Sequence, residues 1–180
     1  MRYFKRITGE RLYLSPVDPD DYEIYTKWMN DPEVIDFLTF RTRIFSAVTE
    51  RKLLEKQAES GYTFAIVRIE DDVLIGNVVL AEVDNISRTA ALGIFIGEAK
   101  YRSNGYGAEA IRLVLDYGFS TLNLHNVELS LQADNERGFA CYQKVGFKEC
   151  GRRREATFKD GKYIDVISMD ILEDEFREKR

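Results

Sequence analysis

Two glycines two positions apart, Gly105 and Gly107, stand at the start of a long amphipathic segment and could hold an anion. Glycine adopts backbone angles that are closed to other residues, so consecutive N–H groups at the start of a helix can point at one ligand. Arg102 would add a charge-assisted contact. We therefore predict a phosphate-binding turn, called the cradle below, that consists of Arg102, Ser103, Asn104, Gly105, Tyr106, Gly107 and Ala108.

The elements on either side of the cradle suit this role. Residues 90–96 (Ala-Ala-Leu-Gly-Ile-Phe-Ile) form a β-prone run in front of it. Behind it, apolar residues recur at spacings of three and four, as they do on a helix that packs against a sheet; they are Ala108, Ile111, Leu115, Phe119 and Leu122. A strand that leads through a glycine turn into a helix is typical of phosphate sites.

A dinucleotide site is the competing interpretation of these glycines. Gly105, Gly107 and Ala110 satisfy the pattern G-x-G-x-x-A. A dinucleotide fingerprint follows its strand almost at once within a βαβ unit, whereas here residues 100–104 are polar or charged and antiparallel strands are expected upstream. The context therefore disfavours NAD. A Walker-type loop is excluded because the ending Gly-Lys-Ser/Thr is missing.

Composition limits the other functions that the chain could have. The 180 residues are 44% hydrophobic, so we expect one domain over 1–180 with a sizeable core. A net charge of -5 argues against nucleic-acid binding and suits a cationic partner. One histidine, together with Cys141 and Cys150 outside any metal-ligand spacing, predicts no metal site. The N-terminus has no apolar signal core and no run is long enough to span a membrane, so we expect a cytoplasmic protein without membrane association.

The periodicity along the chain predicts strands and helices in one α+β arrangement. Asp18 and Ser46 are expected to start helices, Asp31-Pro32 to stop the first of these, and Asp160-Gly161 to form a hairpin turn. The Glu-rich tail after Leu172 is expected to be solvated. Strands are predicted over 11–15, 62–69, 73–83, 89–96, 126–133, 147–158 and 162–171, and helices over 18–30, 46–60, 108–122 and 135–145.

Two ordered motifs carry a resemblance to a known family. Residues 101–108 (Tyr-Arg-Ser-Asn-Gly-Tyr-Gly-Ala) resemble the pyrophosphate loop, Arg/Gln-x-x-Gly-x-Gly/Ala, of the GNAT superfamily of N-acetyltransferases. Residues 135–147 are similar to its signature Asn-x-x-Ala-x-x-x-Tyr-x-x-x-Gly-Phe, with Gly138 in place of the alanine. The resemblance implies a GNAT fold: an α+β domain whose mixed, mostly antiparallel sheet of six to seven strands is splayed at a β-bulge and flanked by about four helices.

The resemblance also implies a cofactor and residues that bind it. The cofactor would be acetyl-CoA, with its pyrophosphate on the cradle. Its pantetheine arm would pair with the strand edge at Phe95 and Ile96, in the opening between the strands at 89–96 and 126–133, and Asn135 would hydrogen-bond the arm. Tyr142 would lie near the thioester sulfur and donate a proton to the departing thiolate. An amine would attack the thioester directly, without an acyl-enzyme.

The general base and the acceptor stay open at this stage. Some relatives place a glutamate where this chain has Ser130, and Glu82 matches a strand glutamate of the spermidine N-acetyltransferases. Glu82 is therefore the candidate base, and a solvated strand carboxylate without a catalytic role is the alternative, which we favour. Glu33 and Asp36 lie in the stretch that flanks the acceptor entrance in the family, but Arg41 and Arg43 accompany them. Mixed charge favours a less charged amine over a polycation.

Two branches of the family contribute to the choice of acceptor. Residues 9–14 and 28–32 resemble the ribosomal-protein N-terminal acetyltransferases, and residues 74–171 are similar to the spermidine enzymes. We favour a peptide or protein N-terminal α-amine, and spermidine is the alternative. A non-catalytic acyl-CoA-binding sensor is a further alternative from another class. Relatives also suggest a homodimer or a larger ring.

Overall fold

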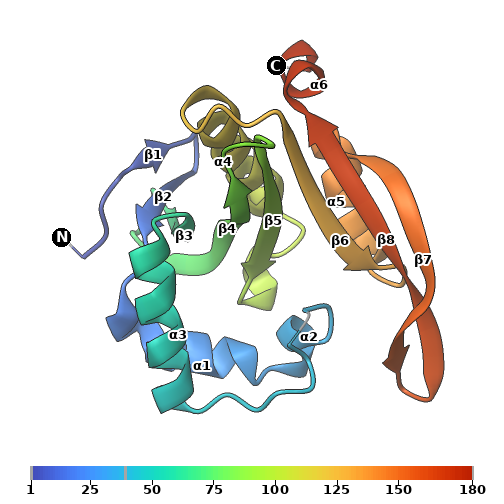
Figure 1. Cartoon of the computed structure of the whole chain (residues 1–180). Helices are drawn as coiled ribbons and strands as arrows, with labels where there is room; N and C mark the ends of the chain where they lie inside the picture. The colour runs from blue at the N-terminus through green and yellow to red at the C-terminus, as the bar shows by residue number, and fades with distance from the viewer. Residues whose placement is uncertain (1, 39, 180) are drawn as a thin grey trace. The chain divides into compact units, whose positions relative to one another are not determined.

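The computed structural model describes residues 2–38 and 40–179, and its contacts divide the chain into two compact units. The first unit consists of Met1–Val79 and Ile94–Val114, and the second of Leu80–Gly93 and Leu115–Arg180. Figure 1 colours the chain from blue to red along its length. Each unit is described by itself. The expectation of a single domain over 1–180 stays a prediction.

The first unit contains antiparallel strands and the helices of the amino-terminal half. The strands are β1 (Ile7–Thr8), β2 (Leu12–Pro16), β3 (Thr63–Arg68) and the beginning of β4 (Leu74–Asp84). β2 pairs with β1 on one side and with β3 on the other, for example at Leu14 and Ile66. The helices are α1 (Tyr22–Met29), which follows a 3-10 turn, α2 (Pro32–Ile35), α3 (Ala47–Ser60) and the first part of α4 (Tyr106–Ser120).

Side-chain caps lie near the predicted helix starts. Ser46 caps α3 as predicted, whereas Asp18 caps the 3-10 turn Pro19–Asp21, and α1 after it has no side-chain cap hydrogen bond. The Asp18 carboxylate accepts a hydrogen bond from the N–H of Asp20 at 2.9 Å, and Ser46 forms a capping box with Thr49. Asp31 caps α2 by accepting from the N–H of Glu33 at 3.0 Å. The dipeptide Asp31-Pro32 therefore ends one helix and begins another.

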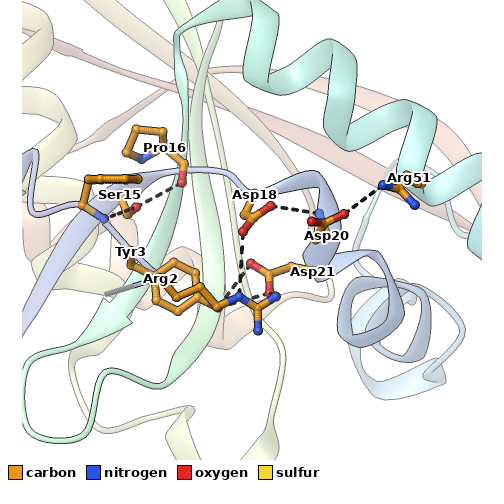
Figure 2. Close-up of polar contacts among 9 residues, drawn as sticks. Arg2, Tyr3, Ser15, Pro16, Asp18, Asp20, Asp21 and Arg51 are labelled. Carbon is orange, nitrogen blue, oxygen red and sulfur yellow. Dashed lines mark hydrogen bonds and ion pairs between the residues drawn. The ribbon is translucent and has the colours of Figure 1, made fainter.

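The N-terminal arm is fastened to the 3-10 turn before α1. Figure 2 shows the Arg2 guanidinium beside Asp18 and Asp21. The Tyr3 hydroxyl donates to the Asp21 carboxylate. Burial raises the pKa of Asp21, although Arg2 acts in the opposite direction. The arm adds Tyr3 to a buried core cluster whose other members include Tyr13, Tyr25, Trp28, Met29, Leu54, Ala65 and Val67.

The second unit holds the carboxyl-terminal strands and helices. Its strands are the end of β4, most of β5 (Thr89–Ile96), β6 (Asn126–Gln132), β7 (Lys148–Lys159) and β8 (Lys162–Leu172). Its helices are the end of α4, α5 (Glu136–Val145) and α6 (Glu173–Glu178). β8 pairs antiparallel with β6 and with β7, and the β7–β8 turn has positive φ at Asp160 and Gly161, as a type I′ turn requires.

The fold class is confirmed: in the described residues eight strands hydrogen-bond in the order β1-β2-β3-β4-β5-β6-β8-β7, mostly antiparallel. The elements outnumber the prediction of six to seven strands and about four helices because three short ones carry no periodicity: β1, α2 and α6.

The tail after Leu172 is not simply solvated, which corrects the prediction of a solvated tail. It forms α6, whose Phe176 is buried at 5.4 Å from the ring of Phe119. No helix in the described residues combines the length and hydropathy that crossing a membrane requires.

Candidate active site

The cradle is a strained turn that opens directly into α4. Ser103 and Gly105 both adopt positive φ, 61° and 84°, and α4 starts at Tyr106. The N–H of Glu109 donates to the Gly105 carbonyl at 3.1 Å, which starts the helical ladder. The N–H groups of Tyr106, Gly107 and Ala108 come before that bond and have no acceptor within the helix. They provide several donors together with the positive end of the helix dipole, and this combination suits a phosphate.

Arg11 supports the cradle through contacts that the sequence did not predict. Its Nη1 donates to the Asn104 carbonyl at 2.9 Å, and its Nε pairs with Glu109 Oε2 at 2.9 Å. The guanidinium also lies 4.8 Å from the centre of the Tyr106 ring. A Cβ added to Gly105 would lie 3.1 Å from Arg11 Nη2. Arg11 therefore ties the turn to the start of β2, and the Gly9-Glu10-Arg11 resemblance was the signal that could have identified it.

The end of β5 is held by two close backbone approaches. A Cβ at Gly76 would lie 2.1 Å from the Phe95 carbonyl oxygen, and a Cβ at Gly97 would lie 2.1 Å from the Trp28 ring. The N–H of Gly97 donates to the Ile75 carbonyl at 2.9 Å. The Phe95 side chain packs edge-on against Trp28 at 6.0 Å. Phe95 therefore anchors the strand through its side chain, and the strand end is fixed from both sides.

The Arg102 side chain points toward this strand end. Its Nε donates to the Ile96 carbonyl at 3.1 Å and its Nη2 to the Gly97 carbonyl at 2.6 Å. Its Nη1 pairs with Glu33 Oε2 at 3.1 Å, although the Glu33 side chain is 70% exposed. Each of the three nitrogens of Arg102 therefore makes a contact within the protein. The N–H groups at the start of α4 are further donors for an anion.

The predicted acceptor carboxylates lie on α2 in the same unit. Glu33 is in its first turn and is engaged by Arg102. Asp36 is the C-cap of α2, and its N–H donates to the Pro32 carbonyl at 3.2 Å. The charge of Glu33 is thus partly neutralised. α2 presents less free negative charge than the sequence alone suggests.

Asn135 and Gly138 are in contact at the start of α5, in the second unit. The Asn135 Oδ1 accepts from the N–H of Gly138 at 2.9 Å, which makes Asn135 the N-cap of the helix. A Cβ at residue 138 would lie 2.7 Å from Asn135 Nδ2. The glycine that replaces the family alanine therefore gives the asparagine side chain room to fold over the helix start.

Tyr142 lies on α5 with its ring edge-on to Phe147, at a centroid distance of 5.9 Å. Burial, assisted by the neighbouring Cys141 thiol, raises the pKa of Tyr142 above its ordinary value of 10.0. The side chain is therefore a neutral phenol at neutral pH. The Cys141 side chain is half-buried and the Cys150 side chain is exposed.

Glu82 is exposed near the end of β4, in the second unit, and has a φ of 52°. A non-glycine residue in this left-handed region is strained, and such strain is concentrated at functional sites. Ser130, where some relatives have a glutamate, is exposed on β6. Glu82 thus has the solvent access that a general base needs.

Strands β5 and β6 are paired in parallel over a short stretch. Thr89, Ala90 and Ala91 pair with Asn126, Val127 and Glu128, and the register ends there within the described residues, while both strands continue. β6 remains paired with β8 as far as Gln132. The opening predicted between these strands stays a prediction, and the end of the register at Ala91 and Glu128 is consistent with it.

A separate cavity of about 520 Å³ lies in the first unit, by the N-terminal arm. Its carboxylates include Asp20, Asp21 and Asp72, which are engaged by Arg51, Arg2 and the Tyr13 hydroxyl respectively. None of the residues predicted to act on a substrate lines this cavity. Because its acids already have partners, we assign it no ligand.

Comparison with known proteins places these features in one family. The sequence profile of the Acetyltransferase (GNAT) domain matches residues 11–148 of this chain. Spermidine N(1)-acetyltransferase of Vibrio cholerae is 36% identical over 103 residues, 57% of this chain and 59% of that protein. A ribosomal N-acetyltransferase-like protein of Bacillus subtilis is 27% identical over 106 residues, 59% of this chain and 57% of that protein. The crystal structure of spermidine N-acetyltransferase from Vibrio cholerae in complex with CoA and spermine matches with a TM-score of 0.83 at 26% identity, over 94% of this chain and 99% of that one.

Proposed function

This chain belongs to the GNAT family of acetyltransferases, and we propose that it transfers an acetyl group from acetyl-CoA to a primary amine, with a peptide or protein N-terminal α-amine as the favoured acceptor. The observation that carries the proposal is the cradle. Its strained turn leaves the N–H groups of Tyr106, Gly107 and Ala108 ahead of the α4 ladder, where they suit the cofactor's pyrophosphate.

The rest of the cofactor would be held by a strand edge. The register between β5 and β6 ends at Ala91 and Glu128, so the following part of β5 has backbone groups that an extended amide chain can pair with. Phe95 and Ile96 supply this edge in the proposal. The Ile96 carbonyl already accepts from Arg102, but a carbonyl oxygen has a second lone pair for the pantetheine arm. Asn135 keeps its Nδ2 donor for the arm while its Oδ1 caps α5.

When bound, acetyl-CoA supplies an activated acetyl group on a thioester. In the proposal Tyr142 holds the proton that the departing sulfur needs, and its buried environment keeps the phenol protonated. The amine must reach the thioester as the free base, because an ammonium has no lone pair for attack. Glu82 is the proposed proton acceptor, directly or through water, and its exposure supports access to the amine.

The preference for a peptide amine rests on α2. The Arg102 guanidinium lies 3.1 Å from Glu33 and reduces its attraction for a polycation. Spermidine is the second candidate, because a spermidine N(1)-acetyltransferase is 36% identical over part of its length and the fold matches that of a spermidine enzyme. A non-catalytic acyl-CoA sensor is the third candidate.

Release of free thiol from acetyl-CoA tests all three candidates in one assay. The panel contains peptides with a free N-terminus, the same peptides acetylated at the N-terminus, and spermidine. We expect thiol release that depends on the free α-amine and is absent with the blocked peptide. A higher kcat/KM for spermidine than for every peptide would favour the second candidate. Cofactor binding without amine-dependent release would instead identify a sensor.

A further inference from the structure

We propose that Arg102 acts as a positioning residue, which fixes the end of β5 for the pantetheine arm and is itself held by Glu33 of α2, rather than as a direct ligand of the pyrophosphate. This inference rests on the proposed function, because it concerns how the same cofactor is held. Arg102 belongs to the loop motif on which a phosphate contact was predicted, and its observed contacts assign it a different task.

The contacts of Arg102 fit a fork that holds two successive carbonyl groups. Nε and Nη2 reach the carbonyl oxygens of Ile96 and Gly97 at 3.1 and 2.6 Å. The side chain is only 10% exposed, so these bonds are shielded from water. A planar guanidinium can meet two neighbouring acceptors at fixed angles, whereas a lysine ammonium is a single point charge on a flexible stem. The planar shape of the guanidinium, and not only its positive charge, is therefore what residue 102 contributes.

The strand end that Arg102 holds has little other freedom. Gly97 is enclosed by Trp28 and donates its N–H to Ile75, while the Phe95 carbonyl faces Gly76. Arg102 takes the remaining carbonyls of this segment, those of Ile96 and Gly97. Without the fork these carbonyls could rotate, and the edge that pairs with the arm would lose its alignment.

Glu33 extends the arrangement to α2. Its carboxylate holds Nη1 at 3.1 Å, across 69 residues of sequence. Because α2 is the element on which the acceptor carboxylates were predicted, Glu33 connects that helix to the strand edge that receives the cofactor. Loss of Glu33 should therefore weaken cofactor binding, an effect that a carboxylate serving only the acceptor would not have.

Binding of two ligands can distinguish a positioning role of Arg102 from direct contact with the pyrophosphate. Coenzyme A carries both the pyrophosphate and the arm, whereas adenosine 3′-phosphate 5′-diphosphate keeps the pyrophosphate and lacks the arm. We expect Arg102→Met and Arg102→Lys to weaken coenzyme A binding about 10-fold or more by calorimetry. Both variants should bind the armless nucleotide within about 2-fold of the unmodified protein. That second measurement also shows that each variant is folded.

Matched controls are available on the same elements. Lys100→Met removes one positive charge two residues from Arg102, on an exposed side chain, and should leave binding of both ligands unchanged. Glu33→Ala should weaken coenzyme A about 2- to 5-fold and spare the armless nucleotide. Glu59→Ala, at an exposed position near the end of α3, should have neither effect.

Equal losses for both ligands, or recovery of coenzyme A binding in Arg102→Lys, would show that Arg102 serves the pyrophosphate by its charge and would overturn the inference. A Glu33→Ala variant that raises only the KM of the amine would overturn the role of Glu33. If the unmodified protein binds neither ligand, the proposed function itself fails. That result is distinct from the other outcomes.

Discussion

At the scale of single residues, Tyr142 combines a packed ring with a hydroxyl whose pKa is raised by burial. A phenol in this state cannot ionise near neutral pH, so it can act on a leaving thiolate only by offering its proton. The ring and the hydroxyl of Tyr142 therefore have different roles in the proposal. The ring packs against Phe147, and the proposal assigns the proton transfer to the hydroxyl alone.

Tyr142→Phe removes the hydroxyl and keeps the ring. Turnover with saturating amine should fall roughly 10²- to 10⁴-fold if Tyr142 is the general acid, while calorimetry should show almost unchanged affinity for coenzyme A. Near-normal turnover would mean that water or another donor protonates the thiolate. The pH profile supplies a control: because the pKa of Tyr142 lies above 10.0, loss of its proton should cause no decline in turnover between about pH 8 and pH 10.

Residue identity predicted the caps and motifs but not the direction of long side chains. Ser46 caps α3 and Asp18 caps the 3-10 turn before α1, both at predicted positions, because a cap depends on atoms two or three residues away. Arg102 was predicted to contact an anion, which stays a prediction, and nothing in the sequence indicated that it would also meet Glu33, 69 residues away. A single sequence carries no signal for such a pair, because it forms only when the fold brings the two residues together.

At the scale of elements, the short ones escaped prediction for a related reason. β1 has two residues, α2 four and α6 six, too few to show a hydrophobic period. Phe176 was the one apolar signal in the acidic tail, and its burial against Phe119 explains why the tail folds. The longer elements, such as α3 and β5, have the positions that their patterns predict.

The helix α3 buries a carboxyl group that should make stability depend on pH. Glu50 is 2% exposed, and its Oε2 has no hydrogen-bond partner among the described residues. Burial raises the pKa of Glu50 to about 7 from an ordinary 4.5. The folded state thus binds this proton more tightly than the unfolded state does, and the associated stability is complete below 4.5 and is lost as the pH rises through 7.

Glu50→Gln mimics the protonated acid and should remove this dependence. We expect the variant to match the unmodified protein at about pH 5 and to exceed it at about pH 8 by on the order of 2–3 kcal/mol, measured by denaturant unfolding. Glu59→Gln on the exposed face of α3 serves as the control and should change stability little at either pH. If Glu50→Gln and the unmodified protein differ in free energy of unfolding by the same amount at both pH values, the raised pKa of Glu50 is not the cause.

At the scale of the whole molecule, the net charge of -5 attracts any cationic acceptor, so long-range attraction and specific recognition must be separated. Long-range attraction by the net charge favours a polyamine whatever the shape and charge of the acceptor site. Specific recognition of the acceptor depends in the proposal on α2, where Arg102 forms an ion pair with Glu33. The homodimer and the single-domain arrangement also belong to this scale, and both stay predictions.

Ionic strength separates the two contributions. Surface attraction is screened beyond about 10 Å at about 0.1 M salt. We expect kcat/KM for spermidine to be low and to fall several-fold between about 0.05 and 0.3 M salt, while the value for a peptide of zero net charge changes less than about 2-fold. Efficient spermidine acetylation at micromolar concentration, maintained at high salt, would instead assign Glu33, Asp36 and Glu82 to polyamine binding.

The early end of the β5–β6 register also determines how the molecule should exchange hydrogen with solvent. In the described residues the β5 register stops at Glu128, so the Ser130 amide, which faces away from β8, should take up deuterium sooner than the amides of Leu129 and Leu131, which face β8. β5 beyond Ala91 should show a similar contrast, and added coenzyme A should slow exchange there if its arm pairs with that edge. Exchange rates that are uniform along both strands, with or without coenzyme A, would mean that the gap is closed in solution. The expected contrast would instead give the free protein an amide pattern that marks the strand edge at which an extended chain can pair.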